Sequence, residues 1–242
     1  MEQAVTNYSA GYAPAEAQAI EVRGVTKDFG DGESRVQVLK GVDLAVAKGE
    51  MLAIMGPSGS GKSTLLGVMS GLDTATDGQV VINGTDITRL GENSLASVRN
   101  RNIGFVFQTF NLIGTLTAQE NVELPILLDP HSRFNASKRA QALLELVGLS
   151  HRRKHRPAQM SGGEQQRVAI ARALANDPEV IFGDEPTGNL DSFNGDALMK
   201  LLTELKEQTG KTLILVTHDP RIAARCDRTV TMQDGMVIGA AR

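Results

Sequence analysis

The stretch MLAIMGPSGSGKSTLLGVM, residues 51–69, decides the fold of this chain. It begins with a short apolar run, Met51 to Met55, passes through a segment rich in glycine and serine, and takes on helical character from Lys62. Residues 56–64 fit the pattern G-x-x-x-x-G-K-[ST], in the strand–loop–helix setting that this pattern requires. The stretch therefore predicts a phosphate-binding loop between a buried strand and a helix.

Each residue type in this loop suits a triphosphate. Glycines let the backbone curl so that N–H groups point inward at phosphate oxygens, and the following helix adds the positive end of its dipole. The Lys62 ammonium suits the β- and γ-phosphates, and the Ser63 hydroxyl suits Mg²⁺. The alternative is a turn that binds nothing, which the lysine, the hydroxyl and the flanking elements together disfavour. The predicted nucleotide-binding residues of the loop are Gly56, Pro57, Ser58, Gly59, Ser60, Gly61, Lys62, Ser63 and Thr64.

Two adjacent carboxylates, Asp184 and Glu185, follow the apolar run VIFG. The carboxyl end of a buried parallel strand is the edge at which α/β sheets bind ligands. We expect Asp184 to hold Mg²⁺ through its water shell and Glu185 to polarise the attacking water. A solvated loop with two acids is the alternative, and the phosphate loop elsewhere in the chain favours the catalytic interpretation.

The remaining pattern predicts an α/β fold. EVIFGDEP (residues 179–186) and TLILVTHD (residues 212–219) are typical of buried strands, and a helical segment that ends at Gly210 separates them. This alternation favours a mostly parallel sheet with helices on both faces. We expect a flexible tail over residues 1–19 and one domain over residues 20–242, and the domain carries an inserted, mainly helical lobe at about residues 92–160.

Composition excludes several classes of protein. The 242 residues carry a net charge of −3, which gives no support for a broad nucleic-acid-binding face. A single cysteine, Cys226, excludes an internal disulfide, and a buried inert thiol is favoured over a reactive one. No run approaches the roughly 18 apolar residues of a membrane span, and the N-terminus lacks the pattern of a secretory signal, so we expect a cytoplasmic protein.

The basic run HRRKH (residues 151–155) suits a solvated patch better than a surface for lipid or nucleic acid, and His131, His151 and His155 are expected at the surface.

A second candidate anion site begins at Ser161. Ser161 and Glu164 fit a capping box at the start of a helix, and a well-capped helix is the simpler interpretation. Gly162 and Gly163 also leave backbone N–H groups at the positive end of that helix, where an oxygen anion is favoured. Since one loop already envelops one triphosphate, an economical arrangement places these residues over the γ-phosphate held by another chain.

The sequence SGGEQQR, residues 161–167, resembles the signature of ATP-binding cassette (ABC) ATPases. The order of the motifs fits as well, and the resemblance covers nearly everything from Ile20 to the C-terminus. The resemblance implies a P-loop NTPase fold with an antiparallel N-terminal β portion and an inserted helical lobe. It also implies an ATPase that uses ATP and Mg²⁺ and dimerises around bound nucleotide.

The same resemblance implies roles for four further residues. Gln108 would link Mg²⁺ and the attacking water to the transporter contact, and Asp191 would connect the two active sites across the dimer. His218 would contact the γ-phosphate, although a histidine after a strand is usually structural. Phe29 would stack on adenine, where tyrosine is more usual; taken alone, it would be read as a core residue.

Three stretches resemble the branch that serves permeases of the lipoprotein-release and macrolide-exporter type: residues 69–80, 110–125 and 183–191. The branch implies two partners, a second copy of this chain and an integral membrane permease of the MacB, LolC or YbbP type. An accessory hydrolase or periplasmic protein is a further candidate partner, and nucleic acid is not expected. The ATPase would lie peripherally at the cytoplasmic face of the inner membrane, where a coupling helix of the permease docks near residues 108–125. Departures from the common pattern are Gly183 and Asn189, and neither threatens hydrolysis.

Two other classes of function compete with a transport-coupled ATPase. A soluble ABC ATPase acting on ribosomes or DNA usually has two cassettes, a zinc-binding insert or a coiled coil, whereas this chain has one cassette, one cysteine and no long heptad run. A GTPase or small-molecule kinase would lack the signature helix, and a GTPase would carry an N-K-x-D run. The sequence therefore favours a subunit that powers a permease, with the cargo set by that permease.

Overall fold

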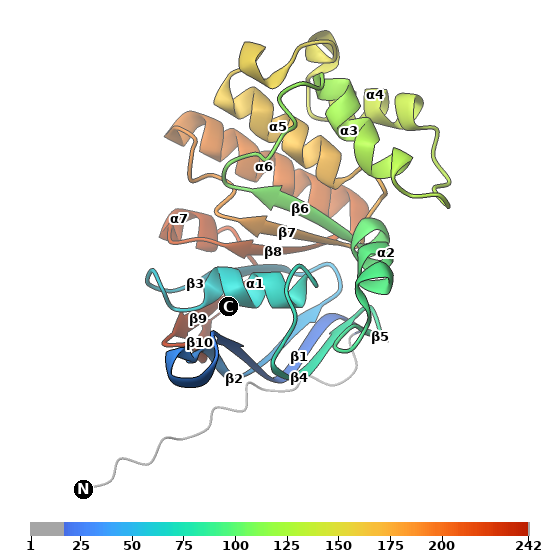
Figure 1. Cartoon of the computed structure of the whole chain (residues 1–242). Coiled ribbons are helices and arrows are strands. Elements are labelled where there is room, and N and C mark those ends of the chain that lie inside the picture. The colour runs from blue at the N-terminus through green and yellow to red at the C-terminus, as the bar shows by residue number, and fades with distance from the viewer. Residues whose placement is uncertain (1–16, 242) are drawn as a thin grey trace, which may run out of the picture.

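Ten strands form two sheets within residues 17–241, which are the residues that the computed structural model describes (Figure 1). Four strands form an antiparallel sheet in the order β2-β1-β4-β5. Six form a second sheet in the order β10-β9-β3-β8-β7-β6, in which only the β10–β9 pair is antiparallel. This arrangement confirms the predicted fold class. The strands are β1 (Gln18–Phe29), β2 (Val36–Ala47), β3 (Met51–Met55), β4 (Asp77–Ile82), β5 (Thr85–Asp86), β6 (Ile103–Phe107), β7 (Val180–Asp184), β8 (Thr212–Val216), β9 (Arg228–Gln233) and β10 (Met236–Ala241).

Helices cover both faces of the six-stranded sheet (Figure 1). They are α1 (Lys62–Met69), α2 (Glu92–Asn102), α3 (Ala118–Leu127), α4 (Ala136–Leu146), α5 (Gly162–Ala173), α6 (Ser192–Thr209) and α7 (Pro220–Ala223), with short 3-10 turns at Gly32–Ser34, Ser150–Arg152 and Pro157–Gln159. Helix α6 ends at Gly210, whose φ of 66° lies in the left-handed region, as expected of a glycine that closes a helix. Among residues 17–241, no helix has both the length and the hydropathy that crossing a bilayer requires.

The strands of the six-stranded sheet send alternate side chains into two cores. Phe182 and Ile214 pack with the antiparallel sheet and α1, whereas Ile181 and Leu213 pack with the core that the helical lobe forms. Strands covered on both faces are apolar throughout, which explains the uninterrupted apolar runs in the sequence. Helix α1 lies between the two sheets, so the phosphate loop before it is fixed by both.

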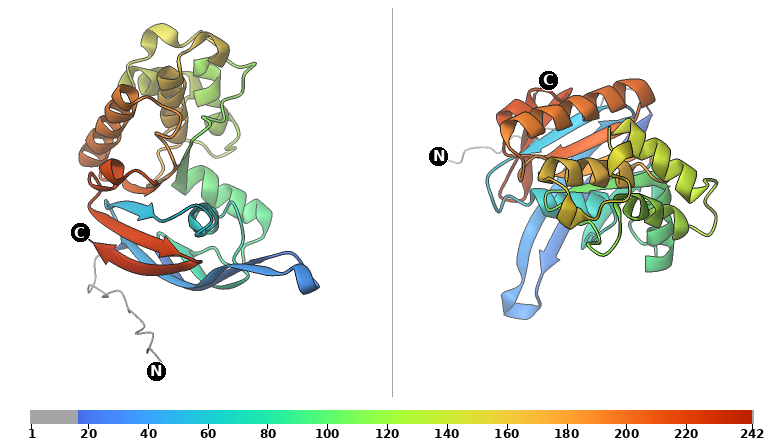
Figure 2. Two further views of the ribbon diagram at one scale, coloured as in Figure 1. Left: turned by 90° about the vertical axis from the view of Figure 1, so that its left-hand side faces the viewer. Right: turned by 90° about the horizontal axis from the view of Figure 1, so that it is seen from above.

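The inserted lobe lies beyond the edge of the sheet that β6 forms (Figures 1 and 2). Helices α3, α4 and α5 pack on one another there, and the apolar face of α4, formed by Ala140, Leu143 and Leu144, is buried. Strand β6 belongs to the central sheet, where Ile103 pairs with Val180, so the proposed insertion over residues 92–160 includes one core strand. Residues 1–16 of the proposed tail (residues 1–19) lie outside the described residues. Strand β1 begins at Gln18, inside the range proposed for the tail.

Candidate functional site

The loop between β3 and α1 has a backbone that glycine makes possible. Gly56, Gly59 and Gly61 have φ values of 151°, 80° and 96°, all in the range that L side chains rarely adopt. A Cβ added at Gly61 would lie 3.2 Å from the carbonyl oxygen of Val38. Gly61 is also the N-cap of α1 and supplies no side-chain hydrogen bond, so no cap occupies the N–H groups of the first helical turn.

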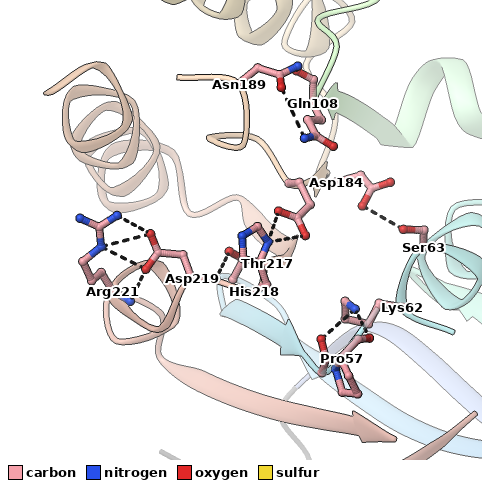
Figure 3. A network of polar contacts seen from close by, with 12 residues as sticks. Pro57, Lys62, Ser63, Gln108, Asp184, Asn189, Thr217, His218, Asp219 and Arg221 are labelled. Atoms are coloured by element: carbon pink, nitrogen blue, oxygen red, sulfur yellow. Dashed lines mark hydrogen bonds and ion pairs between the residues drawn. The ribbon is translucent and has the colours of Figure 1, made fainter. Parts of the chain in front are cut away.

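The side chains of the loop also fit a phosphate group. Lys62 is 9% exposed, and its Nζ donates to the carbonyl oxygens of Gly56 at 2.9 Å and Pro57 at 2.8 Å (Figure 3). The Oγ of Ser60 is buried and has no hydrogen-bond partner among the described residues. A buried cation held over the loop and an unpartnered hydroxyl within it are features that a bound anion would satisfy.

A hydroxyl and a carboxylate meet where Mg²⁺ is expected. The Oγ of Ser63 donates to Oδ1 of Asp184 at 3.2 Å (Figure 3). Burial raises the pKa of Asp184 and Glu185 adds to this, while Ser63 and Lys62 lower it. Within residues 17–241, no three His, Cys, Asp or Glu side chains gather into a metal cluster. A site with few protein oxygens suits Mg²⁺, which keeps several waters and also binds substrate phosphates.

Glu185 is held by its backbone and by His218. Its φ of 48° is unusual for a residue other than glycine, and its N–H donates to the carbonyl oxygen of Val216 at 3.0 Å. The His218 Nδ1 lies 2.6 Å from Oε2 of Glu185 and 2.8 Å from Oε1. Because β7 and β8 are neighbouring parallel strands, the residues that follow them meet at one edge of the sheet. Sparsely populated backbone conformations of this kind cluster at functional sites.

Gln108 follows β6 at the same edge. Its Nε2 lies 3.5 Å from Oδ1 of Asn189, and Nδ2 of Asn189 donates to the backbone oxygen of Gln108 at 3.0 Å (Figure 3). The Gln108 side chain also passes close to Gly188, where an added Cβ would lie 2.7 Å from Nε2. The amide of Gln108 is thus paired with the loop after β7, and its role as a metal ligand stays a prediction. Asn189 was noted from the sequence only as a departure from the common family pattern, and its pairing with Gln108 was not predicted.

Phe29 ends β1 with its ring 46% exposed, so it is not a core residue. Lys27 Nζ lies 4.9 Å from the centroid of this ring and also donates to Oδ1 of Asp73 at 2.6 Å and the Thr74 oxygen at 2.8 Å. Sequence reasoning missed Lys27. No local signal could have found it, because the register of β1 shifts between Lys27 and Asp28 and the groups that hold the ammonium lie far away in sequence. The ring stands at the surface and on a fixed support, which suits the predicted stacking on adenine.

The signature begins at the capped start of α5. The Oγ of Ser161 accepts from the N–H of Glu164 at 3.3 Å, and Oε2 of Glu164 accepts from the N–H of Ser161 at 2.8 Å, which confirms the predicted capping box. Asn194 lies against Gly163, because a Cβ added there would be 2.6 Å from Oδ1 of Asn194. Asn194 also donates twice to the carboxylate of Asp191, at 2.8 Å each, and these bonds lower the pKa of Asp191.

Apart from Phe29, the structure thus brings the predicted residues together in two separate groups. The first comprises the phosphate loop, Asp184, Glu185 and His218, with Gln108 beside it. The second comprises residues 161–163 and Asp191. Helices α1 and α5 pack in different cores, which lie on opposite faces of the six-stranded sheet. In the part of the chain that the structure describes, no hydrogen bond joins residues 161–163 to residues 56–64.

Comparisons with known proteins agree with this arrangement. The family model described as ABC transporter matches residues 39–188. The chain is 50% identical over 218 residues to the lipoprotein-releasing system ATP-binding protein LolD of Shewanella frigidimarina, across 90% of this chain and 91% of that protein. It is 50% identical over 224 residues to the ABC transporter ATP-binding protein YbbA of Escherichia coli strain K12, across 93% and 98% of the two chains.

A solved structure is similar over the same length. The dimeric structure of a post-hydrolysis state of the ATP-binding cassette MJ0796, bound to ADP and Pi, matches with a TM-score of 0.85 at 44% identity, across 92% of this chain and 98% of that one. From the stretches FVFQTFNL, ENVELP and AARCDR we predict a likeness greatest to YbbA. The comparisons give equal identity, 50%, to LolD and to YbbA, which confirms the lipoprotein-release branch. From its motifs, its fold and these relatives, the chain belongs to the ABC transporter family.

Proposed function

We propose that this chain hydrolyses ATP as a homodimer that closes around two MgATP and drives a separate membrane permease. The observation that carries the proposal is the separation of residues 161–163 from the phosphate loop of the same chain. The start of α5 offers N–H groups of Gly162 and Gly163 at its positive end, yet the loop that holds the triphosphate lies across the sheet. A second copy can supply the missing half, and the relative MJ0796 was solved as a dimer bound to ADP and Pi.

Hydrolysis follows from the first group of residues. Glu185 takes a proton from a water whose oxygen attacks the γ-phosphorus, and the bond to the ADP oxygen breaks. Lys62 neutralises charge on the phosphates, and His218 keeps the Glu185 carboxylate in place until the γ-phosphate offers it another contact. Ser63 and Asp184 would hold Mg²⁺, which would neutralise further phosphate charge.

The surface after β6 suits docking of the permease. An open cavity of about 210 Å³ is lined by Phe107, Asn111, Pro125, Arg172 and neighbouring residues. Arg172 donates to the backbone oxygens of Phe110 at 2.8 Å and of Asn111, so this lining is held by the signature helix α5 itself. A permease of the MacB, LolC or YbbP type would dock here and keep the ATPase at the cytoplasmic face of the inner membrane. Its cargo would be a lipid, a lipoprotein or another hydrophobic molecule, or the dimer would transmit motion alone.

The substitution Glu185→Gln tests the catalytic half of the proposal. A glutamine cannot accept the proton, so turnover falls by about 10²–10⁴, the usual contribution of a positioned base. ATP binding survives because the loop is untouched, and the variant accumulates as an ATP-bound dimer in light scattering. Glu145→Gln, an exposed change on α4, is the matched control. A Glu185→Gln protein that turns over at the wild-type rate would show that another group is the base.

A pull-down from detergent-solubilised membranes tests the transport half. The tagged chain should retain an integral membrane protein, and that protein should raise or regulate its ATPase activity when the two are reconstituted. Recovery of ribosomal particles or DNA-bound proteins in place of a permease would favour the soluble alternative.

A further inference from the structure

The basic run at residues 151–155 is not a freely solvated patch. Arg152 Nε donates to Oε1 of Glu164 at 2.9 Å, and the two side chains are only 36% and 15% exposed. His155 is half-buried, and its Nε2 lies 3.2 Å from Nη1 of Arg152. Since a guanidinium group only donates, Nε2 of His155 accepts this bond. The expectation of a solvated run is therefore wrong for Arg152 and His155, because both face the start of α5.

Glu164 also caps the signature helix α5. Its Oε2 accepts from the N–H of Ser161 and fixes the backbone just before Gly162 and Gly163. The bond from Ser161 lowers the pKa of Glu164, and Arg152 lowers it further. Arg152 takes the other carboxylate oxygen, so one carboxylate joins the basic run to the N-cap of α5.

The same run is attached to α3. The carbonyl oxygens of Arg153 and His155 accept from the N–H groups of Gln119 at 3.0 Å and Ala118 at 2.8 Å. These are the first two residues of α3, which borders the proposed docking surface. Residues 152–155 therefore contact both the first turn of α3 and the first turn of α5.

We propose that Arg152 is a positioning residue for the contact between the signature and the γ-phosphate of a second copy. It holds Glu164, and through Glu164 it holds Ser161, so that the N–H groups of Gly162 and Gly163 keep the direction that the partner's nucleotide needs. A displacement of α3 by the permease reaches the signature along the same bonds. This inference rests on the proposed nucleotide-sandwich dimer.

Loss of the Arg152–Glu164 ion pair should have a moderate effect on the dimer dissociation constant, and a homodimer loses this pair twice. Loss of one partly exposed ion pair weakens a contact by about threefold, and a homodimer contains two copies, so the dimer dissociation constant rises by about tenfold. The affinity of a single chain for ATP does not change, because Arg152 touches neither the phosphate loop nor its surroundings.

The test uses the full chain with Glu185→Gln as the parent, because we expect that form to accumulate as a dimer. Sedimentation at saturating MgATP gives the dimer dissociation constant, and a fluorescent ATP analogue at low protein concentration gives the affinity of the monomer. Arg152→Met should weaken dimerisation by about tenfold, whereas Arg152→Lys should keep part of it, since an ammonium still reaches one carboxylate oxygen. Arg153→Met is the matched control, because this neighbouring side chain is exposed and its backbone oxygen is retained.

A double-mutant cycle separates positioning from general stability. In a Glu164→Gln background the amide oxygen still accepts from Ser161, so removal of Arg152 should cost much less than in the parent. Equal losses in both backgrounds, or an unchanged dimer constant in Arg152→Met and Arg152→Lys, would overturn the inference alone. A parent that stays monomeric with MgATP would overturn the proposed dimer and this inference with it.

Discussion

The N-termini of α1 and α5 both present backbone N–H groups that favour an anion, but they differ in how they are capped. Both present backbone N–H groups at the positive end of a helix, where anions are stabilised. At α1 the N-cap is Gly61, which has no side chain to cap the helix. At α5 the N-cap is Ser161, whose hydroxyl and whose backbone N–H are both engaged by Glu164. The first terminus is open to a ligand, whereas the second is partly satisfied by its own chain and keeps the N–H groups of Gly162 and Gly163 for one.

This difference matches the two tasks proposed for them. A loop that wraps a triphosphate needs free N–H groups in several directions, which the glycines before Lys62 provide. A surface that covers one terminal phosphate needs fewer donors and a fixed direction, which the capping box and its neighbours provide. We therefore expect substitutions at α1 to affect binding by one chain and substitutions at α5 to affect assembly of two.

The largest expected effect on nucleotide affinity comes from Lys62→Ala. It removes the only ammonium that contacts the loop in the described structure, here bound to the oxygens of Gly56 and Pro57. Two charge-assisted hydrogen bonds to phosphate together contribute about 3–4 kcal/mol, so ATP affinity should fall by about 10²–10³. Calorimetric titration measures this, with Lys200→Ala on the exposed side of α6 as the control. Unchanged affinity would contradict the loop as the triphosphate site.

Ser161→Arg tests the role proposed for the start of α5 in assembly of two chains. A long cation in place of the hydroxyl crowds the start of α5 and blocks closure on a second chain, while the phosphate loop is unchanged. ATP affinity of the monomer should stay within about twofold, and dimerisation should weaken by roughly 30-fold or more, as expected for an interface that loses its central contact. Ser137→Arg, exposed at the start of α4, is the control for added charge. Dimerisation with ATP that survives Ser161→Arg would remove the cross-chain site.

Local signals in the sequence predict the parts of the fold that decide this comparison. The loop before Lys62 and the capping box at Ser161 each lie within a few residues, so their patterns are visible without a structure. Contacts between distant segments are not visible in this way. The pairing of His218 with Glu185 depends on β7 and β8 lying side by side, and the bond from Arg152 to Glu164 depends on a loop that is docked against α3.

The difference between local and distant signals also explains why the sequence predicted the state of Cys226 but not the role of Lys27. Lys27 supports the Phe29 ring because a loop after α1 holds its ammonium, and that loop lies far away in sequence. Cys226 was predicted to be a buried and inert thiol because free cysteines usually are, and burial does raise the pKa of this thiol to about 12. The burial of a thiol follows from the general preference of that residue type, whereas a specific polar partner requires knowledge of the tertiary fold.

The smallest expected effect separates capping from anion binding at α5. Ser161→Ala removes the hydroxyl that accepts from the N–H of Glu164, while the bond from the N–H of Ser161 to Glu164 remains possible. Loss of an N-cap side chain costs about 1 kcal/mol, which for a chain of this size lowers Tm by about 2–4 °C. Differential scanning fluorimetry without nucleotide measures the capping part, and ATP-dependent dimerisation, compared at equal temperature, measures what the hydroxyl adds to the phosphate contact. No equivalent experiment exists at α1, where Gly61 has no side chain to remove and its φ of 96° would strain an alanine. An unchanged Tm would mean that the Ser161 hydroxyl does not stabilise α5, and only the bond from the Ser161 N–H to Glu164 would then distinguish its start from that of α1.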